Sequence, residues 1–280
     1  MRLATIATAT GPRAAVLRED DTLVDAGTAS VRALLASLDA DGLARLADGA
    51  AQAEESVPLA EAELLAPVTD PEKIVCLGLN YHDHAKETGQ ELPERPMWFP
   101  KFANSLIGSG APIELVPTAP DKTDYEAELA VVIGRTARSV SEDEALDHVA
   151  GAMPFNDVSA RDLQMLNPLW TTGKAVDTFA PCGPALVLMD EIDDLQAITL
   201  RTRIDGEVVQ EGNTADQIFG VAEVVAWLSR TMTLVPGDII ATGTPAGVGA
   251  ARRSYLEPGQ TLEVEAEGLG AVSNPVVLGR

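Results

Sequence analysis

Carboxylates run directly into a buried apolar strand over residues 124–133, and this feature most constrains the fold. Residues 129–133 are apolar, largely β-branched and followed by a glycine, a pattern that indicates a buried strand. Side chains two apart share one face of a strand, so Asp124, Glu126 and Glu128 point the same way if the extended conformation reaches back that far. Like charges at the mouth of a buried strand repel each other, and desolvation adds to the cost. A divalent cation with oxygen ligands would offset it, whereas a solvated acidic strand end remains the alternative from this stretch alone.

The overall charge excludes several classes of partner. The 280 residues contain 43 Asp and Glu against 20 Lys and Arg, for a formal net charge of -23. Such a surface repels phosphate backbones and anionic lipid, so we expect no nucleic-acid partner and no membrane partner. The N-terminus lacks a signal-peptide pattern, and no apolar run approaches the about 18 residues of a membrane span. We therefore expect a cytoplasmic protein.

The pattern of apolar and polar residues changes near residue 70, which predicts two domains, 1–70 and 71–280. The first part carries patterns for short strands at 2–8 and 14–17 and for short helices at 30–38 and 42–48. The second carries many short strand patterns, including a hairpin at 198–212 with the turn Asp205-Gly206. A capping box, Ser141 to Glu144, predicts a helix through residue 150, with Gly151 ending it. Since strands and helices do not alternate, we predict an α+β, predominantly β fold: a mixed β-sandwich or roll with a small α/β N-terminal domain.

A second stretch with candidate chemistry follows the strand pattern at 74–77. His84 and Glu87 lie three apart in a helical segment and therefore share a face. A carboxylate beside a histidine fixes its tautomer and stabilises the imidazolium, which suits a general base. An exposed His–Glu pair is the alternative that the spacing leaves open.

Further polar side chains follow apolar stretches later in the chain. Asp157 is a candidate oxygen ligand, and Arg161 and Gln164, three apart, could face a ligand together. Lys174 comes after a loop containing Trp170. Taken alone, this position is also typical of an exposed lysine without a role at a site. The glycine-rich loop at 242–249 runs into a segment that breaks within a turn, so dinucleotide binding is unsupported. Its backbone amides and the hydroxyl of Thr244 could instead hold a carboxylate.

Taken together, these residues resemble the fumarylacetoacetate hydrolase family. The matching motifs lie in unbroken order over about residues 73–280, and they are Gly78-x-Asn80-Tyr81-x-x-His84-x-x-Glu87, Asp124-Tyr-Glu126-x-Glu128-Leu, Asn156-Asp157-x-x-x-Arg161-x-x-Gln164, Gly173-Lys174, Gly183-Pro184, Pro236-Gly237-Asp238 and Thr242-Gly243-Thr244-Pro245.

The resemblance implies a Mg²⁺ or Mn²⁺ site whose ligands are Glu126, Glu128 and Asp157. Asp124 would be a supporting residue. It further implies the catalytic residues His84, Glu87, Lys174 and Gln164. In that scheme the histidine, oriented by its glutamate, activates water, while the lysine and glutamine stabilise an oxyanion. The residues implied to bind substrate are Arg161, Thr244, Gly243 and Tyr81.

The implied substrates are small 2-oxo or 2,4-dioxo acids, and the metal would stabilise an enolate as a carbon–carbon bond breaks. We expect hydrolysis of an acylpyruvate-type acid, with a place in aromatic catabolism. Decarboxylation of oxaloacetate and isomerisation of 5-carboxymethyl-2-hydroxymuconate-type acids use the same metal and enolate and remain open. A binding protein without catalysis is disfavoured because every required position is filled. We expect a homodimer, and specificity shaped by the segments 97–102 and 166–172.

Overall fold

Strand β11 (Ala127–Ile133) lies inside a long mixed sheet and is buried along its whole length. The computed structural model describes residues 1–279. On one face, Leu129 and Val131 pack in a cluster that includes the second sheet and helix α7 (Val221–Ser229). On the other, Ala130 and Val132 pack in the cluster that contains the N-terminal helices. The apolar run predicted as a buried strand is therefore the centre of the core.

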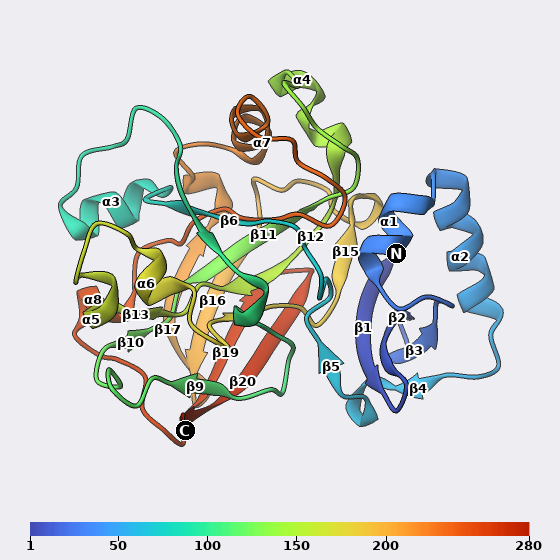
Figure 1. Cartoon of the computed structure of the whole chain (residues 1–280), viewed down its shortest axis with the longest axis horizontal. Coiled ribbons are helices and arrows are strands. Elements are labelled where there is room, and N and C mark those ends of the chain that lie inside the picture. The colour runs from blue at the N-terminus through green and yellow to red at the C-terminus, as the bar shows by residue number, and fades with distance from the viewer. Residues whose placement is uncertain (280) are drawn as a thin grey trace.

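The long sheet has 11 strands and is drawn across the middle of Figure 1. Its order is β4 (Val57–Pro58), β3 (Thr22–Asp25), β2 (Gly11–Leu17), β1 (Arg2–Thr8), β15 (Leu186–Leu188), β12 (Val149–Asn156), β11, β18 (Ile239–Ala241), β6 (Ile74–Gly78) and β7 (Met97–Lys101), with β5 (Leu64–Leu65) paired to β1. Strands β18 and β6 run parallel, while their neighbours pair antiparallel.

The second sheet has five strands and packs against β11 and β12. Its order is β17 (Glu207–Asn213), β16 (Thr199–Ile204), β19 (Thr261–Ala266), β20 (Gly270–Leu278) and β9 (Ile113–Leu115). Two short pairs complete the strands, β10 (Thr123–Asp124) with β13 (Ser159–Ala160) and β8 (Leu106–Ile107) with β14 (Ala180–Pro181). Two packed sheets with few helices confirm the predicted α+β, predominantly β fold, and the hairpin at Asp205-Gly206 forms as predicted.

The helices are short and lie around the sheets. They are α1 (Val31–Ser37), α2 (Ala40–Gln52), α3 (His82–Thr88), α4 (Glu142–Ala145), α5 (Arg161–Gln164), α6 (Thr171–Lys174), α7 and α8 (Gly249–Arg252). Single 3₁₀ turns occupy Leu59–Glu61, Ala103–Ser105, Leu146–His148, Met189–Glu191 and Thr214–Asp216. Within residues 1–279, none of the helices is both long and apolar enough to cross a bilayer. The cytoplasmic location stays a prediction.

The predicted helix over residues 141–150 is wrong beyond its first turn. The capping box of Ser141 and Glu144 forms, but α4 ends at Ala145 and β12 begins at Val149. Gly151 is a strand residue and does not end a helix. A Cβ at this position would collide with the carbonyl oxygen of Val187, so the glycine allows β15 to approach β12.

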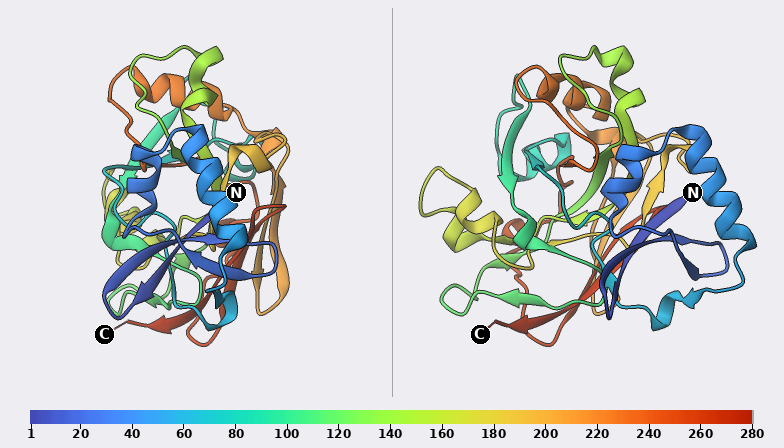
Figure 2. Two further views of the ribbon diagram at one scale, coloured as in Figure 1. Left: turned by 90° about the vertical axis from the view of Figure 1, so that its right-hand side faces the viewer. Right: turned by 45° about the vertical axis from the view of Figure 1, so that its right-hand side comes forward.

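The N-terminal part shares the long sheet with the rest of the chain. Strand β1 pairs with β15 through Arg2 with Val187 and Leu3 with Leu186. Figure 2 (left) turns this part toward the viewer, with α1 and α2 standing above its strands. Backbone pairing thus crosses the predicted boundary at residue 70, and the division into two domains stays a prediction.

Candidate metal centre and active site

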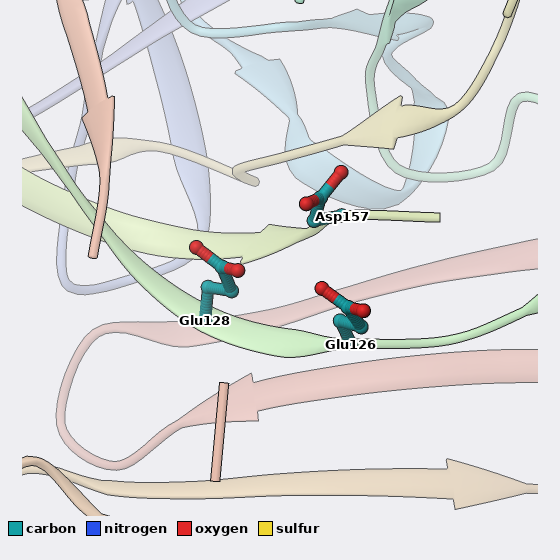
Figure 3. A group of neighbouring side chains, drawn as sticks. All are labelled: Glu126, Glu128 and Asp157. Atoms are coloured by element: carbon teal, nitrogen blue, oxygen red, sulfur yellow. The ribbon is translucent and has the colours of Figure 1, made fainter. Parts of the chain in front are cut away.

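Three carboxylates converge where β11 begins and β12 ends. Pairing of Ala127 with Asn156 places Asp157, the residue that follows β12, beside Glu126, and the amide of Asp157 donates to the Glu126 carbonyl at 3.0 Å. Glu128 is two residues further along β11, on the same face. One oxygen from each carboxylate lies within 4.8 Å of the others, and Figure 3 shows the three side chains directed into the same space.

Asp124 stands apart from this group. It belongs to β10, which pairs with β13, and the ladder of β11 starts only at Ala127. Its carboxylate accepts the amides of Gly249 and Ala250 at 2.6 and 2.9 Å, at the start of α8. It also pairs with Arg161. The single extended run that would bring Asp124 to the glutamates does not form.

Two cations, Lys174 and Arg161, bind carboxylates of this group. Lys174 Nζ lies 2.8 Å from Glu126 Oε2 and 2.6 Å from Asp157 Oδ2. Arg161 binds Glu126 Oε1 at 2.6 Å as well as Asp124. The burial of these groups strengthens each attraction, because little water is present to screen it.

Lys101 is a member of this cluster that the sequence analysis missed. Its ammonium is fully buried and donates to Asp157 Oδ1 at 2.6 Å and to the carbonyl of Val158 at 3.1 Å. The available signal was a lysine at the end of an apolar, aromatic run. That pattern indicates a strand, but it does not tell which group far along the chain the ammonium binds.

Glu126, just before β11, and Glu128, within β11, have pKa values that are shifted in opposite directions. Burial alone would raise the pKa of Glu126, but Lys174 and Arg161 outweigh it and lower the pKa to about 2. The pKa of Glu128 is raised well above its usual range by burial and by the negative charges of Asp157 and Glu126. Glu128 is therefore the carboxylate whose charge the protein alone does not compensate.

The same glutamate carries an unsatisfied oxygen. Glu128 Oε2 accepts the amide of Gly243 at 2.9 Å, whereas Oε1 is buried without a hydrogen-bond partner. Among the described residues only one other buried side-chain atom, Thr123 Oγ1, shares this condition. A buried acceptor without a partner costs about 1–3 kcal/mol. An all-oxygen donor set with an unpaired carboxylate oxygen fits a divalent cation of the Mg²⁺ or Mn²⁺ type.

Helix α3 carries the histidine and glutamate singled out by their spacing. His84 Nδ1 and Glu87 Oε2 are 3.3 Å apart. Glu87 Oε1 also accepts the amide of Gly247 at 2.9 Å, and Asp83 accepts that of Ala246 at 3.1 Å, which ties α3 to the glycine-rich loop. With Nδ1 facing the carboxylate, Nε2 is the nitrogen available to a ligand.

Glu126, His84 and Glu87 border one cavity of about 560 Å³. It is surrounded by α3, α5, α6 and α8, which gather at the left of Figure 1. Its polar lining includes His84, Glu87, Glu126, Arg161, Gln164, Lys174 and Thr244, and its apolar lining includes Leu77, Leu79, Phe99, Met165 and Trp170. The structure therefore brings the predicted catalytic residues to a single space.

Only some of the residues implied to bind substrate lie at this cavity. Arg161 and Thr244 line the cavity, although the Thr244 hydroxyl donates to the carbonyl of Ala127 and accepts from Gln210. The Gly243 amide is taken by Glu128, as described above. Tyr81 does not reach the cavity, because its ring is fully buried in the core and its hydroxyl accepts from Gln217.

Comparisons with known proteins agree with this architecture. The model of the fumarylacetoacetate (FAA) hydrolase C-terminal family matches residues 73–277. Oxaloacetate tautomerase fahd2, mitochondrial, from Xenopus laevis is 46% identical over 218 residues, covering 76% of this chain and 68% of the relative. A crystal structure of 5-carboxymethyl-2-hydroxymuconate delta-isomerase from Mycobacterium smegmatis has a TM-score of 0.81 at 35% identity, with both chains fully covered. One of maleylpyruvate hydrolase from Sphingobium sp. SYK-6 has a TM-score of 0.84 at 29% identity, also with full coverage of both chains.

Proposed function

The chain belongs to the fumarylacetoacetate hydrolase family, and we propose that it enolises small 2-oxo acids at a divalent metal centre held by Glu126, Glu128 and Asp157. The observation that carries this proposal is the unpaired, buried Oε1 of Glu128 beside two further carboxylates. When bound, the cation supplies Lewis-acid charge that favours the enol form of a 2-oxo acid. We propose Mg²⁺ or Mn²⁺ as the metal, because both ions accept this set of carboxylate oxygens.

The residues of the chain supply the proton transfer and the orientation. His84, held by Glu87, is placed at the cavity to take a proton from the carbon next to the oxo group. Lys174 and Gln164 border the same space and can donate to an oxygen that gains negative charge. The burial of the cluster keeps water from screening these charges.

The first candidate reaction is keto–enol tautomerisation of oxaloacetate. It moves one proton from C3 to the C2 oxygen, so it requires a base, a stabilised oxyanion and no cleavage of a carbon–carbon bond. A single histidine that takes up the proton and releases it suffices for this transfer. The Xenopus laevis relative, which is 46% identical, carries this activity in its name, and this supports the choice.

The second candidate is hydrolysis of an acylpyruvate, and the His84–Glu87 pair favours it. A histidine with an adjacent carboxylate can deprotonate water, which attacks the C4 carbonyl. The C3–C4 bond then breaks, C3 is protonated, and pyruvate and a carboxylic acid are released. The maleylpyruvate hydrolase of similar structure supports this candidate, and isomerisation and oxaloacetate decarboxylation share the enolate step.

One set of assays separates these reactions. The loss of enol absorbance of oxaloacetate and the release of pyruvate from acetylpyruvate, fumarylpyruvate and oxaloacetate are each measured with Mg²⁺ and with EDTA. We expect metal-dependent tautomerisation, and pyruvate release from an acylpyruvate identifies hydrolysis. His84→Gln should lower the rate, whereas the control His82→Gln, which changes an exposed residue of the same helix, should not. Equal rates with Mg²⁺ and EDTA would overturn the proposal.

We also propose that the chain forms a homodimer, as the family resemblance implies. Light scattering coupled to size exclusion should give twice the mass of the chain. A mass equal to one chain at all accessible concentrations would contradict this.

A further inference from the structure

The cavity also has an apolar lining, which the chemistry of the carboxylates does not use. We call it the apolar corner and define it by Leu77, Leu79, Phe99, Met165 and Trp170. The rings of Phe99 and Trp170 meet edge to face, with centroids 5.6 Å apart and planes at 68°. Lys174 Nζ lies 5.0 Å from the Phe99 centroid, so the apolar corner directly adjoins the charged centre.

The position of Trp170 depends on a glycine at the end of β6. A Cβ at Gly78 would collide with the indole ring, so the ring lies against bare backbone. Phe99 comes from β7, the neighbouring strand, where Cys76 is paired with Phe99. Strand β7 thus carries Phe99, and the end of the adjacent strand β6 leaves room for the ring of Trp170, so the two rings meet.

The cation nearest to the aromatic pair is Lys174, whose ammonium already binds other groups. The cations that line the cavity are Arg161 and Lys174. Both are already paired, the arginine with Asp124 and Glu126 and the lysine with Glu126 and Asp157. A carboxylate placed against Phe99 and Trp170 would lose water, and the cation nearest to it, Lys174, is already neutralised by two carboxylates, which makes this placement unfavourable.

The size of the cavity allows a substrate longer than a four-carbon acid. Cavities of about 300–1,000 Å³ hold drug-sized ligands, and this one has about 560 Å³. A ligand whose oxo-acid end lies at the carboxylates therefore has space to extend past Phe99.

We propose that the apolar corner binds an uncharged, apolar tail, aromatic or branched, of a 2-oxo or 2,4-dioxo acid. This rests on the proposed function and goes beyond it, because it names the kind of tail and disfavours substrates whose second carboxylate lies on a tail longer than that of oxaloacetate. The aromatic pair selects the tail, while the carboxylate cluster binds the oxo-acid end.

Binding measurements can test the preference apart from turnover. Calorimetry with Mg²⁺ compares oxalate, which has an oxo-acid end and no tail, with phenylpyruvate and 2-oxoglutarate, which carry an aromatic and a carboxylate tail. We expect phenylpyruvate to bind about tenfold tighter than 2-oxoglutarate, or more. In Trp170→Ala this ratio should fall to about twofold, with the affinity for oxalate unchanged.

A matched control is offered by the same region. Trp98 is the neighbour of Phe99 on β7, is 44% exposed and does not line the cavity, so Trp98→Ala should keep the tenfold ratio. Phe99→Leu, which keeps the corner apolar but removes the aromatic pair, replaces Trp170→Ala if that variant does not fold.

The outcomes distinguish the two proposals. If oxalate binds but phenylpyruvate has no advantage over 2-oxoglutarate, the tail subsite is wrong and the proposed function stands. If Trp170→Ala weakens all three ligands equally, the aromatic pair is structural and the inference is also overturned. If oxalate does not bind in the presence of Mg²⁺, the proposed metal centre itself fails, and the tail subsite fails with it.

Discussion

The molecule contains two arrays of paired charges, one exposed and one buried. The surface charge ladder, on β16, β17 and β19, is formed by Arg201, Arg203, Glu211, Glu263, Glu265 and Glu267. The buried charge cluster is formed by Lys101, Arg161, Lys174, Glu126, Glu128 and Asp157. Their pair distances are nearly the same, 2.7 Å for Arg203 with Glu265 and 2.6 Å for Lys174 with Asp157.

Burial separates the two arrays. The side chains of Arg203 and Glu265 are each 27% exposed, whereas those of Lys174 and Asp157 are 2% and 0% exposed. An exposed pair contributes about 0–1 kcal/mol, while removing charges from water costs several kcal/mol for each ion. Distance alone therefore says little about what a charge pair does. A fold that keeps a buried carboxylate such as Glu128 without full compensation indicates a function for it.

The largest effect should come from a change in the buried cluster that removes a ligand. Asp157→Asn keeps the shape but removes a negative charge that faces the metal position. We expect activity to fall about 10³-fold, because the developing negative charge loses its stabilisation. Mn²⁺ binding, followed by electron paramagnetic resonance, should weaken in parallel. Glu263→Gln in the surface charge ladder is the control, and a similar loss there would remove the distinction between the arrays.

The next effect concerns stability. Lys101→Met removes a buried cation from Asp157 and leaves the carbonyl of Val158 without that donor. Breaking a buried pair in this way costs about 3–5 kcal/mol, measured by urea unfolding in EDTA. The control Arg13→Met removes an arginine that is 32% exposed and paired with Asp25, which is 52% exposed, and it should cost less than half as much. Equal losses would show that burial does not set the energy.

A gain in stability is expected at the uncompensated carboxylate. The pKa of Glu128 is raised on folding, so its ionisation disfavours the folded state. As pH rises from the usual carboxyl pKa of about 4.3 toward the raised pKa, the metal-free protein loses this part of its stability. Glu128→Gln should remove that loss and stabilise the metal-free protein at pH 7 by about 0.5–2 kcal/mol, while metal binding is lost.

Thermal unfolding in EDTA across pH 2 to 8 measures this effect. Glu126 is the internal comparison, because its pKa is lowered to about 2 and its contribution is instead lost as pH falls from about 4.5 to 2. A Glu128→Gln protein that is less stable than the parent at pH 7 would contradict the assignment of an uncompensated charge.

The smallest effect should be found in the surface charge ladder. Arg203→Ala removes contacts with Glu263 and Glu265 and should cost at most about 1 kcal/mol. The difference from the parent should shrink further in about 1 M salt, where the Debye length is about 3 Å. Urea unfolding at low and high salt checks this, and a loss comparable to that of Lys101→Met would overturn the comparison.

The sequence by itself determined the features that depend on local spacing. The buried strand β11, the two glutamates on one of its faces, the hairpin at Asp205-Gly206 and the His84–Glu87 pair on α3 all follow from periodicity and turn chemistry. The order of the motifs indicated the family and, through it, the ligand set with Asp157. These predictions hold because the geometry of a strand or helix fixes which nearby residues share a face, wherever the element is packed.

Only the tertiary structure decided which distant groups meet. Lys101 and Asp157 are 56 residues apart, and no local sequence pattern around either residue predicts the contact between them. Gly151 has the pattern of a helix end, yet the close approach of β15 explains why a glycine is there. Tyr81 lies within a motif of the site, yet packing places it in the core. In each case the deciding contact joins residues far apart in the chain, and local pattern reports the conformation of a segment but not the neighbour it will have.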